Sequence, residues 1–346
     1  MRHLNHAVSR SSVFIGVLLL CAAVFANNSW ENTPEYEALV EAALQEGSLT
    51  LHTSGAEAAM ASLGQEFERT FPGMTVNMLR LPSGALNARY GTETSSGVAQ
   101  VDVFNSATID LFEQHVEWWQ PITPELVPSS ADWPVTARKD HYMYTGHSGH
   151  GLVYNTNMVE DPPNSWEDVL DPRYKNDCLI IDPRTSPTFV SFYQLLAEGY
   201  GEEFLVRLRE QNCKFAQAGL PTSQEVAAGG AAIGFPVTVS QVVEPQQMGA
   251  PIARTEPAAG SPVPAHGVVQ YFGIPVNAPH PNAARLYLTW FLSPEVQSLS
   301  CELGGYGSPL EAAEGCFSVA DDFQPSRSLS EEQTAKVMQL LGIRQD

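Results

Sequence analysis

The stretch Ser48–Leu79, SLTLHTSGAEAAMASLGQEFERTFPGMTVNML, decides the fold class of this chain. Residues 48–53 alternate apolar and polar side chains, which is typical of a half-buried strand. After Ser54-Gly55, one helical face is formed by Met60, Leu63, Phe67 and Phe71. Pro72-Gly73 ends that helix, and residues 74–79 return to a strand pattern. A strand, a helix and a second strand in this order predict an α/β protein with a parallel sheet.

The same alternation continues on both sides of this unit. Before it, Thr33-Pro34 predicts a helix start and Gly47 its end. After it, residues 101–104 predict a third strand. A second α/β region is predicted beyond residue 160, with a helix start at 165–168, a strand at 179–181 and helices at 188–198 and 202–211. Further helices are expected at 282–291, at 294–299 and from the capping box at Ser330.

Length and charge narrow the class of protein. The chain has 346 residues, and Lys+Arg 18 against Asp+Glu 39 gives 18 − 39 = −21. So acidic a chain is no nucleic-acid binder, because those proteins neutralise phosphates with Lys and Arg. Charged residues are only 16% and hydrophobic residues 43%, enough for a folded core. The length exceeds what one core normally serves, so we expect two lobes.

The N-terminus predicts export. Residues 1–26 carry Arg2 and Arg10 and no acidic residue, and an apolar run follows at Val13–Phe25. These are the parts of a secretory signal peptide, with cleavage expected before Asn27. Without them the net charge is 16 − 39 = −23. We therefore expect an exported, periplasmic protein.

The four cysteines beyond the signal peptide predict two disulfides, because an exported chain meets an oxidising compartment. Three pairings of Cys178, Cys213, Cys301 and Cys316 are possible. The most local choice joins Cys178 to Cys213 and Cys301 to Cys316. No pair has the spacing of a redox or zinc motif.

Small polar residues follow each of the first three predicted strands. They are Thr53-Ser54-Gly55, Pro82-Ser83-Gly84 and Asn105-Ser106. The carboxyl ends of strands in open α/β sheets lie beside helix N-termini, and ligands bind there. The pattern therefore predicts a ligand site at this edge.

Several further segments, in order and spacing, carry a family resemblance. They are Gly151–Asn157, Pro163–Asp168, Leu170–Lys175, Asp182-Pro183, Val226–Gly229, Pro279–Ala284 and Phe291–Gln297. Together they resemble the extracellular solute-binding proteins of ABC importers, in the cluster that includes ferric-iron, 2-aminoethylphosphonate and thiamine binders. The resemblance covers essentially the whole chain after the signal peptide.

The resemblance implies a two-lobed clamshell of the type II periplasmic-binding-protein kind, each lobe a mixed, mostly parallel sheet flanked by helices. On that template, lobe one is 27–146 plus 264–299, and lobe two is 147–263 plus 300–346. The Gly-rich run at 146–151 would act as a hinge, because Gly tolerates large changes in φ and ψ. The implied partners are a small-molecule solute and a membrane permease. We expect a monomer without a cofactor.

The ligand is expected to be a small anion or zwitterion. The family's iron binders supply two adjacent tyrosines after the segment that corresponds to 226–229, whereas residues 234–240 read GFPVTVS here. Iron is therefore kept as the alternative, and an organophosphonate such as 2-aminoethylphosphonate is favoured. Arg184 is the cation next to the cluster, and Glu57 or Tyr144 would face an amine. The candidate ligand residues are Thr53, Ser54, Ser83, Gly84, Asn105, Ser106, His147, Thr185, Ser186 and Thr188.

Two further functions are weighed against this one. His147 and His150 are three residues apart, which on a strand places them on opposite faces, so no metal site is predicted. Residues 146–150, GHSGH, resemble the nucleophile elbow of a secreted serine hydrolase around Ser148. That motif needs Gly at position 150 and a strand-turn-helix context, so we predict a carrier with no catalytic residue.

Overall fold

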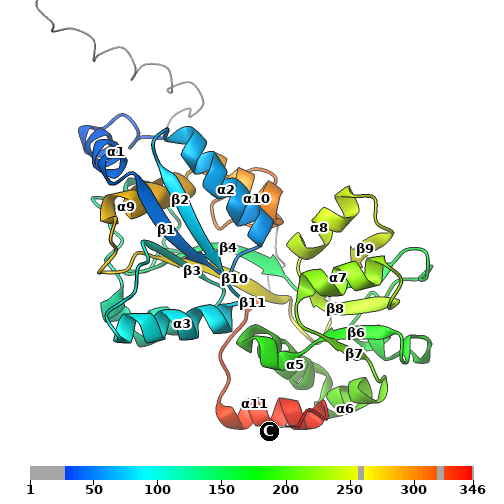
Figure 1. Cartoon of the computed structure of the whole chain (residues 1–346). Coiled ribbons are helices and arrows are strands. Elements are labelled where there is room, and N and C mark those ends of the chain that lie inside the picture. The colour runs from blue at the N-terminus through cyan, green and yellow to red at the C-terminus, as the bar shows by residue number, and fades with distance from the viewer. Residues whose placement is uncertain (1–27, 256–260, 318–322, 345–346) are drawn as a thin grey trace, which may run out of the picture.

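The computed structural model describes residues 28–255, 261–317 and 323–344. The predicted signal peptide, residues 1–26, lies outside the described residues. Two sheets, each covered by helices, form two lobes side by side (Figure 1). This confirms the predicted two-lobed α/β architecture.

The first lobe is built on a six-stranded sheet within the described residues. Its order is β11-β10-β3-β1-β2, and β4 pairs with the other edge of β10 from Gly267 to Phe272. β1 is parallel to both β2 and β3, whereas β10 is antiparallel to β3 and β4. The predicted β-α-β unit is therefore present. The strands are β1 (Ser48–Thr53), β2 (Thr75–Arg80), β3 (Val103–Ser106), β4 (Met143–Gly149), β10 (His266–Gly273) and β11 (Gln324–Pro325).

Helices cover both faces of this sheet. On one face Phe67 of α2 packs edge-on against Tyr287 and Trp290 of α9, with ring centroids 5.1 and 5.2 Å apart. On the other face Tyr90 of α3 packs against Phe104 at 4.6 Å. The helices are α1 (Pro34–Glu46), α2 (Glu57–Thr70), α3 (Ser83–Ser95), α4 (Asp110–Gln114), α9 (Pro281–Phe291) and α10 (Pro294–Gly304).

The second lobe has a five-stranded sheet of order β7-β6-β8-β5-β9. β6 is parallel to β7 and β8, and β5 is antiparallel to β8 and β9. The strands are β5 (Gly151–Asn155), β6 (Cys178–Ile181), β7 (Lys214–Ala216), β8 (Ile233–Val237) and β9 (Ile252–Thr255). The helices are α5 (Pro187–Tyr200), α6 (Glu202–Glu210), α7 (Gly219–Ala227), α8 (Ser240–Gln247) and α11 (Glu331–Leu340).

One predicted helix is shorter than expected. The helix start at residues 165–168 leads only to a 3₁₀ turn, Glu167–Leu170. Asp171 is extended, with φ −59° and ψ 132°. Proline at 172 explains this, because the residue before a proline is driven away from helical geometry.

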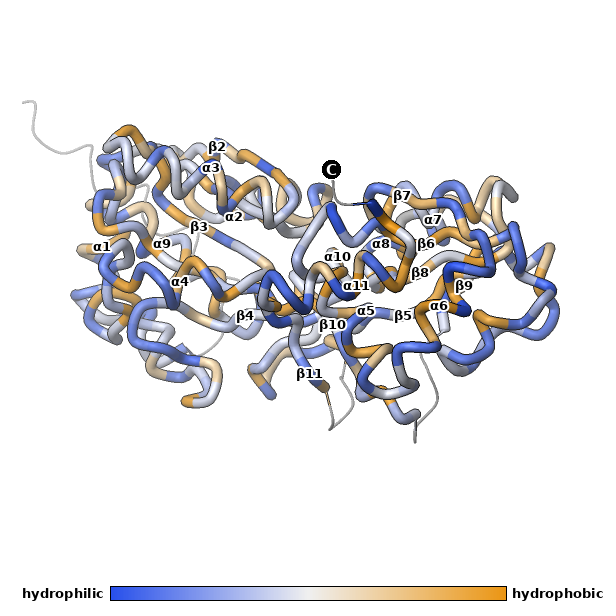
Figure 2. The backbone as a smooth tube through the Cα atoms, turned by 90° about the horizontal axis from the view of Figure 1, so that it is seen from below, coloured by the Kyte–Doolittle hydropathy of each residue, from blue (hydrophilic) through white to orange (hydrophobic). Residues whose placement is uncertain are grey.

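The chain passes between the lobes three times. It leaves the first sheet between β4 and β5, returns between β9 and β10, and leaves again between β11 and α11. In Figure 2, β4, β10 and β5 lie in the middle of the molecule between the two lobes.

At least one glycine at the first of these passes is required by close packing of the backbone. Gly146, Gly149 and Gly151 all lack a positive φ. A Cβ on Gly151 would lie 2.5 Å from the carbonyl oxygen of Thr255. Glycine is therefore required at 151 because two backbones approach closely. The hinge role of the run stays a prediction.

The tail of the chain divides between the lobes at a different place from the predicted one. Residues 300–304 complete α10, which packs on α2 of the first lobe. Farther along, the Tyr306 hydroxyl accepts a hydrogen bond from the Ala56 amide at 3.0 Å, and β11 pairs with β10. α11 packs on α5 and α6. We therefore propose a lobe boundary between β11 and α11 in place of the one at residue 299.

Both disulfides have the most local pairing. Cys178 joins Cys213, with Cα atoms 4.7 Å apart, and Cys301 joins Cys316, with Cα atoms 4.8 Å apart. The first ties β6 to the segment before β7, and the second ties α10 to the segment that follows it.

Among the described residues, no helix has the length and apolar character needed to cross a bilayer.

Candidate functional site

The N-termini of α3 and α5 meet across the two lobes. The hydroxyl oxygens of Ser83 and Ser186 lie 3.2 Å apart, and both side chains are buried. A Cβ added to Gly84 would lie 3.7 Å from Cδ of Pro187, an ordinary contact distance. Three of the predicted site residues, two from one lobe and one from the other, are thus brought together.

The α5 terminus is shaped by the turn that precedes it. Ser186 is the N-cap, and its hydroxyl accepts a hydrogen bond from the Thr188 amide at 3.3 Å. Thr185 donates its hydroxyl to the Asp182 carbonyl at 2.8 Å, so its side chain holds the turn. Thr188 is buried, and its Oγ1 has no hydrogen-bond partner within the described residues. This terminus therefore offers a polar atom that the folded chain itself leaves unused.

Thr53 and Asn105 lie deeper than the serines, inside the first lobe. Thr53 donates its hydroxyl to Asn105 Oδ1 at 2.6 Å. The Asn105 amide nitrogen donates to Gln270 Oε1 at 3.0 Å and to the Tyr271 carbonyl at 3.2 Å. Both residues are fully buried. Their polar groups join β1, β3 and β10 and support the sheet edge from within.

Ser54 and Ser106 are bound into the loops at that edge. Ser54 Oγ accepts from the Ala107 amide at 2.9 Å. Ser106 donates to Asn87 Oδ1 at 2.9 Å, and Asn87 donates to Thr108 Oγ1 at 2.7 Å. Sequence reasoning missed Asn87 and Thr108. The signal was available, because Asn87 stands four residues after Ser83 and so lies on the same helix face.

His147 lies in β4, which contacts the segment that follows α10. Its backbone pairs with that of Gly307, with N···O distances of 3.0 and 2.8 Å. The hydroxyl of Tyr144 makes a short hydrogen bond with His147 Nδ1. Burial lowers the pKa of His147, so the ring is neutral at pH 7. Tyr144 is therefore already engaged, while Glu57 is exposed at the first position of α2.

Two arginines lie at the ends of strands that lead to the site. Arg184 forms a fork with Asp182, with Nε 3.0 Å from Oδ1 and Nη2 2.6 Å from Oδ2. Burial raises the pKa of Asp182, but the hydrogen bonds and charge of Arg184 outweigh it and lower the pKa. Arg80 ends β2 and donates its Nε to the Gly55 carbonyl at 3.2 Å. Arg80, which was not among the predicted site residues, thus also lies at a carboxyl strand end.

The residues that would serve a serine hydrolase or a metal site lie away from the contact between α3 and α5. Ser148 lies in β4 between its neighbours in the sheet, and its hydroxyl donates to the Gly305 carbonyl at 3.3 Å. His150 contacts His266, with Nδ1 atoms 3.1 Å apart. Among the described residues, no group of three or more His, Cys, Asp and Glu side chains is placed to hold a metal ion.

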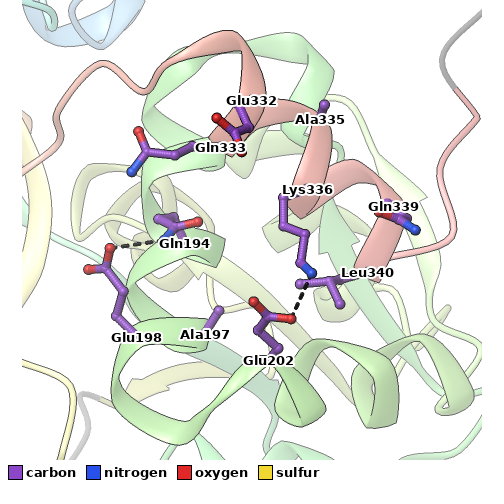
Figure 3. Close-up of a pocket in the computed structure, with 10 residues that line it drawn as sticks. All are labelled: Gln194, Ala197, Glu198, Glu202, Glu332, Gln333, Ala335, Lys336, Gln339 and Leu340. Carbon is purple, nitrogen blue, oxygen red and sulfur yellow. Dashed lines mark hydrogen bonds and ion pairs between the residues drawn. The ribbon is translucent and has the colours of Figure 1, made fainter.

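A cavity of about 660 Å³ lies away from this site, in the second lobe (Figure 3). It is bounded by α5, the start of α6, and α11, and Lys336 is paired there with Glu202 at 2.9 Å. No predicted site residue lines it. The cavity marks where α11 docks on its own lobe and is separate from the contact between α3 and α5.

The two lobes, their three connections and the polar edge between them define a two-lobed solute-binding protein. The family model for bacterial extracellular solute-binding proteins matches residues 51–298. The chain belongs to this family. The resemblance to extracellular solute-binding proteins seen in the sequence is confirmed. The narrower cluster of ferric-iron, 2-aminoethylphosphonate and thiamine binders stays a prediction.

Solved structures with the same fold have little sequence in common with this chain. The substrate-binding protein of an ABC transporter from Agrobacterium tumefaciens is 16% identical, with a TM-score of 0.75 over 85% of this chain and 93% of that one. Iron-bound HitA from Pseudomonas aeruginosa is 15% identical, with a TM-score of 0.66 over 85% and 97%. AfuA from Actinobacillus pleuropneumoniae, with fructose-6-phosphate bound, is 18% identical, with a TM-score of 0.64 over 86% and 97%. These likenesses show the fold.

Proposed function

We propose that this protein binds a small anionic or zwitterionic solute between its lobes in the periplasm, as a monomer, and delivers it to a membrane permease. An organophosphonate such as 2-aminoethylphosphonate is the favoured ligand. The observation that carries the proposal is the approach of Ser83 to Ser186, because it brings two helix N-termini from opposite lobes to one place.

The chemistry of that place suits an anion. A helix N-terminus presents unpaired N–H groups and a partial positive charge. α3 has no side-chain cap, so its first amides are not satisfied by a neighbouring side chain. Hydroxyls from Ser83 and Ser186 add donors that can rotate toward a phosphonate oxygen. Such directed donors bind an anion even in a protein with net charge −21.

The segment after β8 favours the same class of ligand. In place of tyrosines it presents Thr238 and Ser240, whose hydroxyl oxygens lie 3.1 Å apart. Phenolate and carboxylate oxygens are what ferric iron prefers, whereas hydroxyls suit a phosphoryl group. The presence of fructose-6-phosphate in AfuA is consistent with a phosphoryl ligand in this fold.

A thermal-shift screen tests the proposal. The probes are 2-aminoethylphosphonate, other phosphonates, phosphate esters, carboxylates, thiamine and ferric citrate, each added to protein that begins at Asn27. A ligand at 100 times its Kd stabilises the native state by about 2.7 kcal/mol, which raises the melting temperature visibly. We expect a phosphonate to give the largest shift. A shift with ferric citrate alone, with a charge-transfer colour, would make iron the ligand. Esterase activity lost on Ser148→Ala would replace the carrier with a hydrolase.

A further inference from the structure

Arg80 occupies the carboxyl end of β2, at the edge of the sheet where the polar loops gather. It pairs in register with Thr53 of β1, and it is exposed. Ser83, at the inter-lobe contact, follows it by three residues. The positive charge of Arg80 thus lies on the connection from β2 to α3, and the N-terminus of α3 is the part that contacts α5.

The guanidinium is anchored through one nitrogen. Nε donates to the carbonyl of Gly55, in the loop that leads from β1 into α2. That loop is itself fixed, because the Ala56 amide donates to the buried Tyr306 hydroxyl at 3.0 Å. Within the described part of the chain, neither Nη of Arg80 meets a hydrogen-bond acceptor or a carboxylate. The anchored Nε orients the group and leaves the Nη pair available.

Arg184 provides a contrast on the other lobe. Its guanidinium is forked onto Asp182, whose side chain is 3% exposed, so its charge is largely compensated by a carboxylate. A compensated arginine adds little net attraction for an anion. The charge of Arg80 is not compensated by a carboxylate within the described residues. An arginine with two free parallel N–H groups binds planar or tetrahedral oxyanions through two hydrogen bonds.

We propose that Arg80 is a specificity-determining residue that binds the doubly charged form of a phosphonate or phosphate group. The inference rests on the proposed function. Helix termini each supply only about half an elementary charge, enough for a singly charged anion. A full cation beside these termini would add the charge compensation that favours a second negative charge. Arg80 therefore makes the protein prefer phosphoryl dianions to monoanionic carboxylates.

The test measures Kd for 2-aminoethylphosphonate by calorimetry at pH 5 and pH 8. A phosphoryl group loses its second proton near pH 6, so its charge differs between these two conditions. The proteins are wild type, Arg80→Gln, Arg80→Lys and the control Arg89→Gln. Arg89 is an exposed residue of α3 paired with Glu93 at 2.7 Å. Urea unfolding of each variant checks that the fold is intact.

We expect wild type to bind at least tenfold more tightly at pH 8 than at pH 5. Arg80→Gln should weaken binding at pH 8 by about 10- to 100-fold and abolish the difference between the two pH values. Arg80→Lys should keep part of the pH difference, and Arg89→Gln should behave as wild type. If wild type binds and Arg80→Gln has the same affinity and pH profile as wild type, the proposed role of Arg80 is wrong but the proposed function still stands. If wild type binds neither this probe nor any other anion of the screen, the proposed function falls and this inference falls with it.

Discussion

Ser83 and Ser186 come from opposite lobes, and their hydroxyl oxygens lie 3.2 Å apart. Each is at the first turn or cap of a helix, and each helix begins at the carboxyl edge of its own sheet. The contact joins the two lobes, so we expect it to break when they separate. A ligand that binds between these helices shifts the protein toward the closed form by its differential affinity for that form.

Ser83→Ala should weaken binding of the solute with little effect on folding. Ser83 does not cap α3, so we expect the free energy of unfolding to change by less than about 0.5 kcal/mol. Loss of a hydrogen bond made only in the closed form should reduce affinity about 3- to 10-fold. Calorimetry with the best ligand of the screen measures this. Ser95→Ala, at the exposed end of the same helix, is the control, and equal affinities for both variants would contradict the prediction.

Asn105→Ala should destabilise the fold itself. The side chain is fully buried and joins three strands, accepting from Thr53 and donating to Gln270 and Tyr271. Truncation leaves these partners buried and unpaired, which costs about 2–3 kcal/mol. Urea denaturation with constant m-value checks this. A variant as stable as wild type would mean that these hydrogen bonds do not support the sheet edge.

Acid should destabilise the protein through the buried histidines His150 and His266. Burial, and then the charge of Arg327, lower the pKa of His266 to about 3. Burial, His266 and Arg254 lower that of His150 well below its ordinary value. The unfolded chain therefore binds more protons than the native one below pH 6.5. Stability is fully present above pH 6.5 and falls as the pH drops toward 3, by on the order of a few kcal/mol.

The measurement is urea unfolding at pH 7.5, 6, 5 and 4 for wild type and His266→Gln. The variant should lose part of the slope of stability against pH. His115→Gln is the matched control, because His115 is an exposed histidine stacked on Trp118. If His266→Gln shows the same slope as wild type, the buried pair is not the source of acid sensitivity.

Removing the Cys178–Cys213 disulfide should cost more stability than removing Cys301–Cys316. The two bridges close sequence separations of 35 and 15 residues. The loop-entropy model gives about 3 kcal/mol for the shorter loop and somewhat more for the longer one. Paired Cys→Ala variants, unfolded in urea without reductant, compare the two. The reverse order would show that native packing, and not loop closure, sets the difference.

Sequence periodicity predicted the strands and helices well because their hydrogen bonds and burial patterns are local. β1 was predicted at its observed bounds, and α9 was predicted to within one residue. The helix start at 165–168 was placed correctly, but Pro172 acts on the residue before it and limits the segment to a 3₁₀ turn. The hinge role of the glycine run stays a prediction, and at Gly151 the structure adds a separate need for glycine, because the Thr255 backbone lies against it.

The candidate site was predicted only as a set of polar residues. Strand ends converge on one edge, so Ser83, Ser186 and Asn105 could all be named from the chain alone. The sequence could not separate Asn105, which lies inside the first lobe, from Ser83 and Ser186, which meet between the lobes. That difference depends on how deep each side chain lies in the folded lobe. Arg80 was missed because its position at the end of a strand does not reveal whether a carboxylate pairs with its guanidinium.

The α/β class, the two-lobed family and the polar character of the strand ends could all be predicted from the amino-acid sequence. These follow from short-range periodicity and from motifs that survive in order along the chain. Only the tertiary structure decided that Thr53 and Asn105 bond inside one lobe while Ser83 and Ser186 meet between lobes. Hydrogen bonds reach only about 3 Å, so partners 103 residues apart are chosen by sheet register and lobe closure.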